Sequence, residues 1–287
     1  MIDGADFDPS SLPDPVEIDW ENLDSDNAFG EASFELLKDL VFTALPLASI
    51  VNGAPFERNE AILRACFLRT VLLGKSLLSD ITFNDGYQQI QIGRQAYEVA
   101  ANYMYLRGDD GSGDRFTQFI NDQLAAEKHS LELIDQMIRK RGDDAMPIEK
   151  RMRQSMERMA SAAGVDLGDV PSIKKTGWPS AFERFEAFGP AAYLPYRTGS
   201  SGLHGGWSAL LLHELEEVEG GFTLTGRGSP PDTRPVLALA AMILLVADMH
   251  LSDLCGDRER AIFHGRLNVI GERRQRLDEL HEEWIQS

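Results

Sequence analysis

The sequence predicts an all-α protein, a single helical bundle of about eight or nine helices that follows an extended acidic N-terminal arm. Apolar residues recur at intervals of three and four along most of the 287-residue chain, which is the period of an amphipathic helix. Few segments alternate between apolar and polar residues as a half-buried strand does. We therefore expect an acidic arm over residues 1–29 and one helical domain over residues 30–287.

Negative charge is concentrated at the beginning of the chain. The formal net charge is −18; the first 39 residues hold twelve acidic side chains against Lys38, which gives −11 and leaves −7 for the rest. A strongly acidic chain does not coat nucleic acid by bulk electrostatics. The body of the protein is only mildly acidic, so a local basic pocket is compatible with it.

Residues 1–29 contain nine acidic residues and four prolines or glycines, and they show no helical or strand period. This composition is typical of a disordered tail. Phe7, Trp20 and Phe29 give the arm apolar anchors, and a second interpretation is that it packs along the protein and shields basic residues near an RNA site. The sequence leaves both interpretations open.

Short stretches rich in Gly and Asp divide the helical domain, for example residues 84–86, 108–113 and 141–144. A stretch without a clear period, Gly164 to Ser180, predicts a surface loop. Apolar spacing predicts helices over 31–47, 58–81, 87–106, 115–139, 148–163, 182–217, 235–254 and 258–284.

The sequence favours a cytoplasmic protein without a membrane span. Its beginning lacks the basic and apolar regions of a secretory signal. The best apolar run, Val236 to Ala247, has twelve residues, which are too few to cross a bilayer and are typical of a core helix. Cys66 and Cys255 match no zinc or CxxC spacing, which indicates reduced thiols.

Arg197 and His204 are the candidate catalytic residues because they form an Arg-x6-His segment inside a helical pattern. An always cationic Arg beside a His that titrates near neutrality is a minimal set for cleaving a phosphodiester without metal. On a helix they lie on nearly the same face, about 10.5 Å apart along the axis. The alternative is a surface Arg and a His that precedes a Gly-Gly kink. A second match, Arg258 and His264, shows that such spacing also arises by chance.

Four glycines interrupt this helical pattern: Gly199, Gly202, Gly205 and Gly206. Each costs helix stability by about 1 kcal/mol relative to alanine, so its presence requires a reason. Glycine permits the close approach of a neighbouring helix or of a ligand, and we expect one of these two at this segment.

Aromatic, charged and small residues recur in two groups around this segment. They are Arg94, Tyr97, Glu98, Asn102, Tyr103, Tyr105, Trp178, Pro179, Tyr193, Tyr196, Arg197, Ser201, His204 and Gly205. This pattern, between Ala61 and Ala209, resembles a bacterial family of unknown function related to the higher-eukaryote-and-prokaryote nucleotide-binding (HEPN) superfamily. The resemblance implies a helical bundle, a metal-independent RNase of toxin–antitoxin or phage-defence systems, and a homodimer. It also implies that Arg197, Thr198 and His204 take the motif positions.

Arg94 and Glu98 stand four residues apart, as an ion pair on a helix surface does. The resemblance supports a second role, in which Glu98 holds Arg94 or Arg197 at the site. Three further supporting candidates belong to the motif segment: Tyr193, Thr198 and Ser201.

No metal or cofactor is expected. No Glu-x2-His pair repeats on two helices, so a di-iron site is unsupported. Asp248, His250, Asp253 and Cys255 have metal-binding atoms, and the simpler interpretation is the polar end of a core helix. The glycines around Gly199 do not form a phosphate-binding loop, because no strand precedes them.

The leading hypothesis is a metal-independent ribonuclease with RNA as substrate, a second copy as partner, and an antitoxin or defence-system protein as a further partner. In it, His204 is the general base or acid and Arg197 stabilises charge on the phosphorane. The alternative hypothesis is a catalytically silent helical module that binds a partner protein or a nucleotide. The glycine interruptions and the acidic charge favour this alternative.

Overall fold

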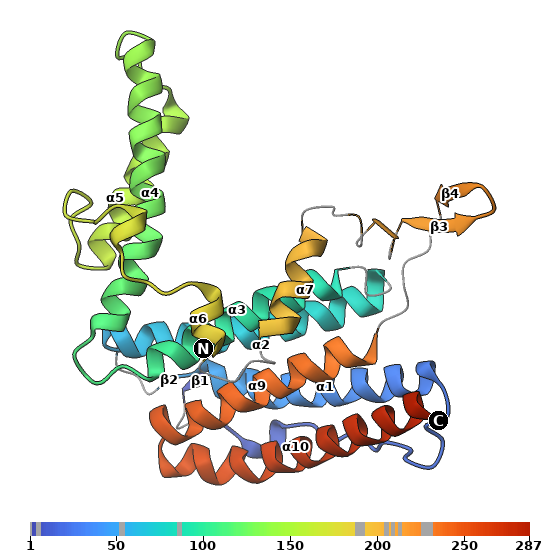
Figure 1. Ribbon diagram of the computed structural model, residues 1–287. Helices are drawn as coiled ribbons and strands as arrows, with labels where there is room; N and C mark the ends of the chain where they lie inside the picture. The colour runs from blue at the N-terminus through green and yellow to red at the C-terminus, as the bar shows by residue number, and fades with distance from the viewer. Residues whose placement is uncertain are drawn as a thin grey trace. The chain divides into compact units, whose positions relative to one another are not determined.

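The computed structural model describes residues 2–3, 7–51, 55–84, 88–186, 193–203, 207, 210–211, 214–224 and 232–287. Within these residues the protein is all-α, as the sequence predicts, with two short two-stranded sheets (Figure 1). The chain divides into two compact units where the sequence suggests one body. Unit 1 comprises Met1–Met104 and Arg184–Ser287, and unit 2 comprises Tyr105–Glu183. The first boundary falls inside helix α3 (Gln89–Arg107), so no linker marks it in the sequence.

Four long helices of unit 1 form a bundle. Helix α1 packs on α2, α9 and α10, and α9 also packs on α2 and α10. Fully buried side chains such as Leu40, Phe67 and Ile243 fill the space between them. The bounds of these helices are α1 Asp26–Ser49, α2 Arg58–Asn84, α9 Thr233–Leu254 and α10 Asp257–Gln286.

Helix α1 begins earlier than the sequence suggests. The Ser25 side chain caps its first turn by accepting a 3.3 Å hydrogen bond from the Ala28 N–H, and Asp26 adds a negative charge at the positive end of the helix. Residues 26–29 therefore belong to α1, and the arm ends at Ser25. Strand β1 (Ile2–Asp3) pairs in parallel with β2 (Ile50–Val51), directly after the end of α1.

The arm packs on the bundle over residues 7–25. That it shields basic residues near an RNA site stays a prediction. Its only helical turn among these residues is η1 (Pro9–Ser11). Phe7 is buried and its ring stacks on Phe263 of α10 at 5.4 Å. Trp20 packs against the cluster of Phe29, Leu237 and Leu277. Two of the predicted anchors, Phe7 and Trp20, are thus in contact with the bundle, and the third, Phe29, is part of α1.

Arginines of α10 hold the main chain of the arm. Arg258 donates to the Phe7 carbonyl over 3.2 Å, Arg266 donates to the Pro13 carbonyl, and Arg273 donates to the Val16 carbonyl over 2.8 Å. These bonds use peptide oxygens of the arm as acceptors. The arginine side chains of α10 thus find hydrogen-bond acceptors in the backbone of the arm.

Helix α9 is longer than the apolar run that the sequence analysis used. It has 22 residues and is long and apolar enough to cross a membrane by length and composition. Half of its apolar stretch is buried inside the protein, where the helix packs on α1, α2 and α10. The twelve-residue run from Val236 to Ala247 is thus the middle of a helix with polar residues toward both ends, such as Thr233 and His250.

Unit 2 is built on a helical hairpin. Helix α4 (Asp114–Lys140) and helix α5 (Pro147–Ala162) pack together and are joined by residues 141–146, so they run antiparallel (Figure 1). The following segment, which includes η2 (Ile173–Lys175), is a loop as predicted. Its Trp178 ring lies 5.2 Å from the rings of Tyr105 and Phe119, which fixes the end of the loop on α4.

One helix prediction is wrong at its end. Helical spacing predicts a helix through Glu217, but β3 (Leu215–Val218) and β4 (Gly221–Leu224) form an antiparallel hairpin. Gly220 adopts φ +88°, a conformation open to glycine, and this lets the chain reverse between the two strands. Two further helices complete unit 1 and its boundary: α6 (Ala181–Glu186) and α7 (Tyr193–Leu203).

Candidate functional site

Arg94 ties helix α3 to helix α7 in unit 1. Its Nε donates a hydrogen bond to Ser200 Oγ over 2.9 Å, and its Nη2 donates to the Tyr196 hydroxyl over 2.9 Å. Its guanidinium carbon also lies 4.5 Å from the centre of the Tyr196 ring. Because Tyr196 and Ser200 stand one turn apart, a single planar side chain fixes two turns of α7 on α3.

Gly199 makes this close contact sterically possible. A Cβ atom at Gly199 would lie 2.6 Å from the Arg94 Cβ and 3.0 Å from the Ile90 carbonyl oxygen. Real Cβ atoms do not approach other atoms so closely, so α7 would have to move away from α3. The structure therefore gives Gly199 the first of the two predicted reasons, the close approach of a neighbouring helix.

Glu98 lies between two guanidinium groups. Its Oε2 is 3.2 Å from Arg94 Nη1, and its Oε1 is 3.7 Å from Arg184 Nη2. Arg184 is 4% exposed, so this carboxylate accompanies a buried cation. A buried charge that loses its counter-charge destabilises the fold. Removing Glu98 would take the same carboxylate away from both Arg94 and Arg184. Glu98 thus pairs with Arg94, and its expected role at a catalytic site stays a prediction.

Three aromatic rings pack beside these charges. Phe185, which is fully buried, lies 5.2 Å from the Tyr196 ring and 6.1 Å from the Tyr193 ring, and the two tyrosine rings are 5.6 Å apart. Burial, and after it the nearby Glu98 carboxylate, raises the pKa of Tyr196. The Tyr196 hydroxyl therefore stays protonated at neutral pH and accepts the hydrogen bond from Arg94.

Arg197 is exposed on α7, one residue after Tyr196. One residue is a rotation of about 100° around a helix, so Arg197 projects from a different side than the ring that contacts Arg94. Helix α7 ends at Leu203, and His204 lies outside the described residues, as do the side chains of Thr198 and Ser201. The shared cleft of Arg197 and His204 stays a prediction.

Ser200 and Arg184 were not predicted as members of this cluster, and Tyr196 was predicted only as part of the family pattern. Ser200 and Tyr196 have a visible signal, because they are four residues apart and flank the glycine that faces α3. Arg184 has none, since its pairing with Glu98 joins residues 86 positions apart.

The second Arg/His match serves another purpose. Arg258 holds the arm at the Phe7 carbonyl, and the exposed His264 ring lies 3.2 Å from the Asn268 side-chain amide on α10. This pair therefore differs from Arg197 in its surroundings. Of the two, Arg258 belongs to the contact between the arm and the bundle.

His250 lies in the core of the bundle. Its ring is 4.5 Å from the Phe67 ring, and neither ring nitrogen has a hydrogen-bond partner among the described residues. Burial, and after it the charge of Arg64, lowers the pKa of His250 to about 3. Within the described part of the chain, no three His, Cys, Asp or Glu side chains converge to hold a metal ion.

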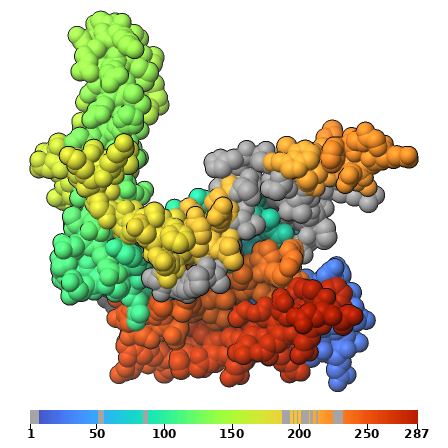
Figure 2. All heavy atoms as spheres, in the orientation of Figure 1, coloured from blue at the N-terminus to red at the C-terminus, as the bar shows by residue number. Residues whose placement is uncertain are grey.

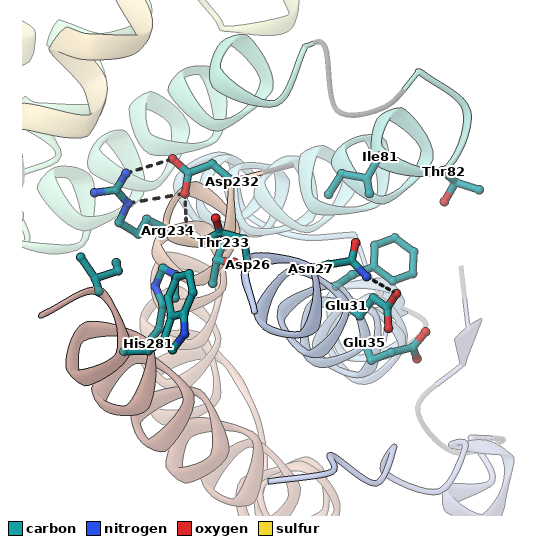
Figure 3. Close-up of a pocket in the computed structure, with 14 residues that line it drawn as sticks. Asp26, Asn27, Glu31, Glu35, Ile81, Thr82, Asp232, Thr233, Arg234 and His281 are labelled. Atoms are coloured by element: carbon teal, nitrogen blue, oxygen red, sulfur yellow. Dashed lines mark hydrogen bonds and ion pairs between the residues drawn. The ribbon is translucent and has the colours of Figure 1, made fainter. Parts of the chain in front are cut away.

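A pocket of about 970 Å³ opens at one end of the bundle, where the first turns of α1 and α9 meet the last turns of α2 and α10 (Figure 3). Asp232 and Arg234 form an ion pair on one side of it, and Asn27 donates to Glu31 on another. Its remaining charged lining is acidic, with Asp26 beside Glu31, so it does not suit a phosphate. No sequence pattern predicts this pocket, because the residues that line it come from segments far apart in the chain.

The fold and the site together define an all-α protein in which an arginine on one helix fixes a second, glycine-containing helix that bears an exposed arginine. Residues 60–222, more than half of the chain, match a family described as a family of unknown function (DUF5677). The chain belongs to this family. The matched residues run from α2 through β4 and include Arg94, Glu98 and Arg197. No curated protein and no solved structure matches the chain.

Proposed function

We propose that the protein is a metal-independent ribonuclease of the phage-defence or toxin type, which acts in the cytoplasm as a homodimer and cleaves RNA with Arg197 and His204. The observation that carries the proposal is the setting of Arg197: it is an exposed cation on a helix that Arg94 and Gly199 hold against α3. The resemblance of the motif segment to HEPN ribonucleases supplies the reaction.

In the proposed reaction, His204 takes the proton of an RNA 2′-hydroxyl as general base. The 2′-oxygen then bonds to phosphorus, the bond from phosphorus to the 5′-oxygen breaks, and the leaving oxygen receives a proton from a general acid. Arg197 pairs with the phosphate oxygens, whose negative charge grows as the phosphorane forms. The products are a 2′,3′-cyclic phosphate and a 5′-hydroxyl end.

Fixing α7 has a catalytic purpose in this proposal. A displacement of about 1 Å at a group that contacts the reacting phosphate reduces the rate by about 100-fold. The hydrogen bonds from Arg94 to Tyr196 and Ser200 set the position of the helix, and thereby the origin of the Arg197 side chain. Arg94 and Tyr196 are therefore positioning residues, and Arg197 is the group that meets the RNA.

The test is RNA cleavage by the full-length protein in the presence of EDTA. We expect Arg197→Ala and His204→Ala each to lower the cleavage rate by about 100-fold or more. The matched control is His264→Ala, since Arg258 and His264 have a similar spacing, Arg-x5-His, without the Tyr and Gly context, and lie on α10. Activity that survives both motif variants, or that disappears in His264→Ala, would show that the wrong pair has been chosen.

A second pair of variants separates positioning from folding. Gly199→Ala places a Cβ against Arg94, whereas Gly265→Ala on α10 places one in open space. We expect Gly199→Ala to cleave RNA about tenfold more slowly than the wild type and Gly265→Ala to cleave it at the wild-type rate. Circular dichroism should show equal stability for the two variants. Equal activity of the two variants would show that the contact between α3 and α7 does not affect catalysis.

The alternative function is a catalytically silent module that binds a partner protein or a nucleotide. The observation that favours it is that Arg94 contacts Glu98 and residues of α7, and that Arg184 contacts Glu98. A guanidinium engaged in this way holds the fold and does not reach a substrate. Absence of cleavage for every RNA tested, with unchanged binding of a partner by Arg197→Ala, would establish this alternative.

A further inference from the structure

The α4–α5 hairpin carries large apolar side chains that nothing in unit 2, all of whose residues the structure describes, covers. Their exposed fractions lie between 40% and 48%, and three of the five are methionines. They are Leu133 and Met137 on α4 and Ile148, Met152 and Met159 on α5. A contiguous set of exposed apolar residues on a helix pair marks an interaction site rather than ordinary surface.

These five side chains project to one side of the hairpin. On α4, Leu133 directly precedes the buried Ile134, and on α5, Met159 directly precedes the buried Ala160. One residue is a rotation of about 100° away from the packed face. Because the two helices run antiparallel, this rotation carries both exposed stripes to the same side. Figure 2 shows the end of the hairpin in light green, formed by these two helices. We call the five residues the docking face.

The edge of the docking face is basic. Arg151 and Arg158 precede Met152 and Met159 by one residue, and Lys140 follows Met137 by three, so all three cations lie beside the apolar stripe. Each of these side chains is exposed. In a chain whose net charge is −18, this edge is a local concentration of positive charge.

We propose that the docking face binds an amphipathic helix of a partner protein, with acidic residues beside its apolar stripe. Two packed helices present a groove that a third helix fills, and methionine side chains adapt to the residues they meet. The basic edge selects acidic residues on the partner. A second copy of the chain would place equal cations opposite Lys140, Arg151 and Arg158, and RNA would leave the apolar stripe uncovered.

The probe is a synthetic, fluorescently labelled amphipathic helix of about 20 residues with a leucine stripe flanked by glutamates; a lysine-flanked peptide serves as its counterpart. Fluorescence anisotropy with the full-length protein measures both. We expect saturable binding of the glutamate-flanked peptide and about tenfold weaker binding of the lysine-flanked one.

Substitutions on the two sides of α5 locate the site. Met152→Glu puts a charge in the docking face, whereas Ser161→Glu puts the same charge at an exposed position one residue beyond the buried Ala160, on the other side of the helix. We expect about tenfold weaker binding from Met152→Glu and no change from Ser161→Glu, with both variants folded by circular dichroism. The double variant Arg151→Glu/Arg158→Glu should reverse the preference between the two peptides.

Three outcomes would overturn the proposal. The first is no binding of the glutamate-flanked peptide, or equal binding by Met152→Glu. The second is a dimer in sedimentation that Met152→Glu converts to a monomer, which would assign the face to a second copy. The third is RNA binding that Arg151→Glu/Arg158→Glu abolishes and Met152→Glu leaves unchanged, which would assign only the basic edge, and assign it to nucleic acid.

Discussion

The four-helix bundle of unit 1 and the α4–α5 hairpin of unit 2 cover the apolar faces of their helices to different extents. In the bundle, α1 packs on three helices, and Leu37 and Leu40 are fully buried. In the hairpin, α4 packs on α5 and the short η2 turn, and Leu133 and Met137 stay about half exposed.

The difference shows that the number of neighbours, more than the helix sequence, decides how much of an apolar stripe is covered. A helix with one neighbour buries one side of its stripe and leaves the adjacent side to solvent. The bundle even has an outer cover, since the arm lies along α10. The hairpin also exposes apolar side chains, but no segment of unit 2 lies over them.

The same substitution in both regions tests this comparison most strongly. Leu40→Ala in α1 removes a fully buried side chain, so we expect it to lower the free energy of unfolding by about 2–5 kcal/mol. Leu133→Ala in α4 removes a half-exposed one, and we expect a change within about 0.5 kcal/mol. Urea unfolding followed by circular dichroism measures both. Similar losses for the two variants would mean that the hairpin is covered in solution.

Histidines in the two regions give a pH-dependent contrast. The unfolded chain protonates His250 below about pH 6.5, whereas the folded protein does not until about pH 3, so the free energy of unfolding falls as the pH drops through this interval. In the wild type, this decrease in the free energy of unfolding is on the order of 3 kcal/mol between neutral pH and pH 4, and His250→Leu should remove it. His129→Leu, at an exposed position of α4 in the hairpin, is the control for replacing a histidine with leucine. Parallel profiles for wild type and His250→Leu would contradict a buried, neutral ring.

The arm gives the smallest effect. Phe7→Ala removes the ring that stacks on Phe263. We expect it to lower the free energy of unfolding by about 1–3 kcal/mol and to speed hydrogen exchange in residues 7–20. The control is Phe83→Ala, since Phe83 is 81% exposed on α2. Unchanged exchange in the arm after Phe7→Ala would show that the arginines of α10 hold it without this ring.

The sequence predicted the parts of the fold that depend on local pattern. The apolar period located the long helices. Phe7, Trp20 and Phe29 supported packing of the arm as one of two open interpretations, and the structure shows Phe7 and Trp20 packed. The period failed at Leu215–Val218, where a hairpin forms because Gly220 permits a tight reversal. It also could not divide the chain into two units, because the boundary falls inside a continuous helix.

The candidate site was predicted only where its residues are close in sequence. Arg94 and Glu98 are one turn apart, so their pairing was visible, and Gly199 indicated a close approach without naming the other helix. The contacts of Arg94 with Tyr196 and Ser200 join residues more than one hundred positions apart. Such contacts depend on how α3 and α7 pack, which no local spacing encodes.

The arm has a consequence for the order in which the protein folds during synthesis. Its contacts with α10 join residues 251, 253 and 257 positions apart, so the ribosome completes every other described element before these bonds form. Until then, α1 in the nascent chain lacks α10, one of the three helices that cover its apolar face, and exposed apolar surface of this kind makes a chain prone to aggregate. Translation that stops before Asp257 therefore releases a chain whose arm has lost its binding site, with the anchors Phe7 and Trp20 exposed to proteases and chaperones.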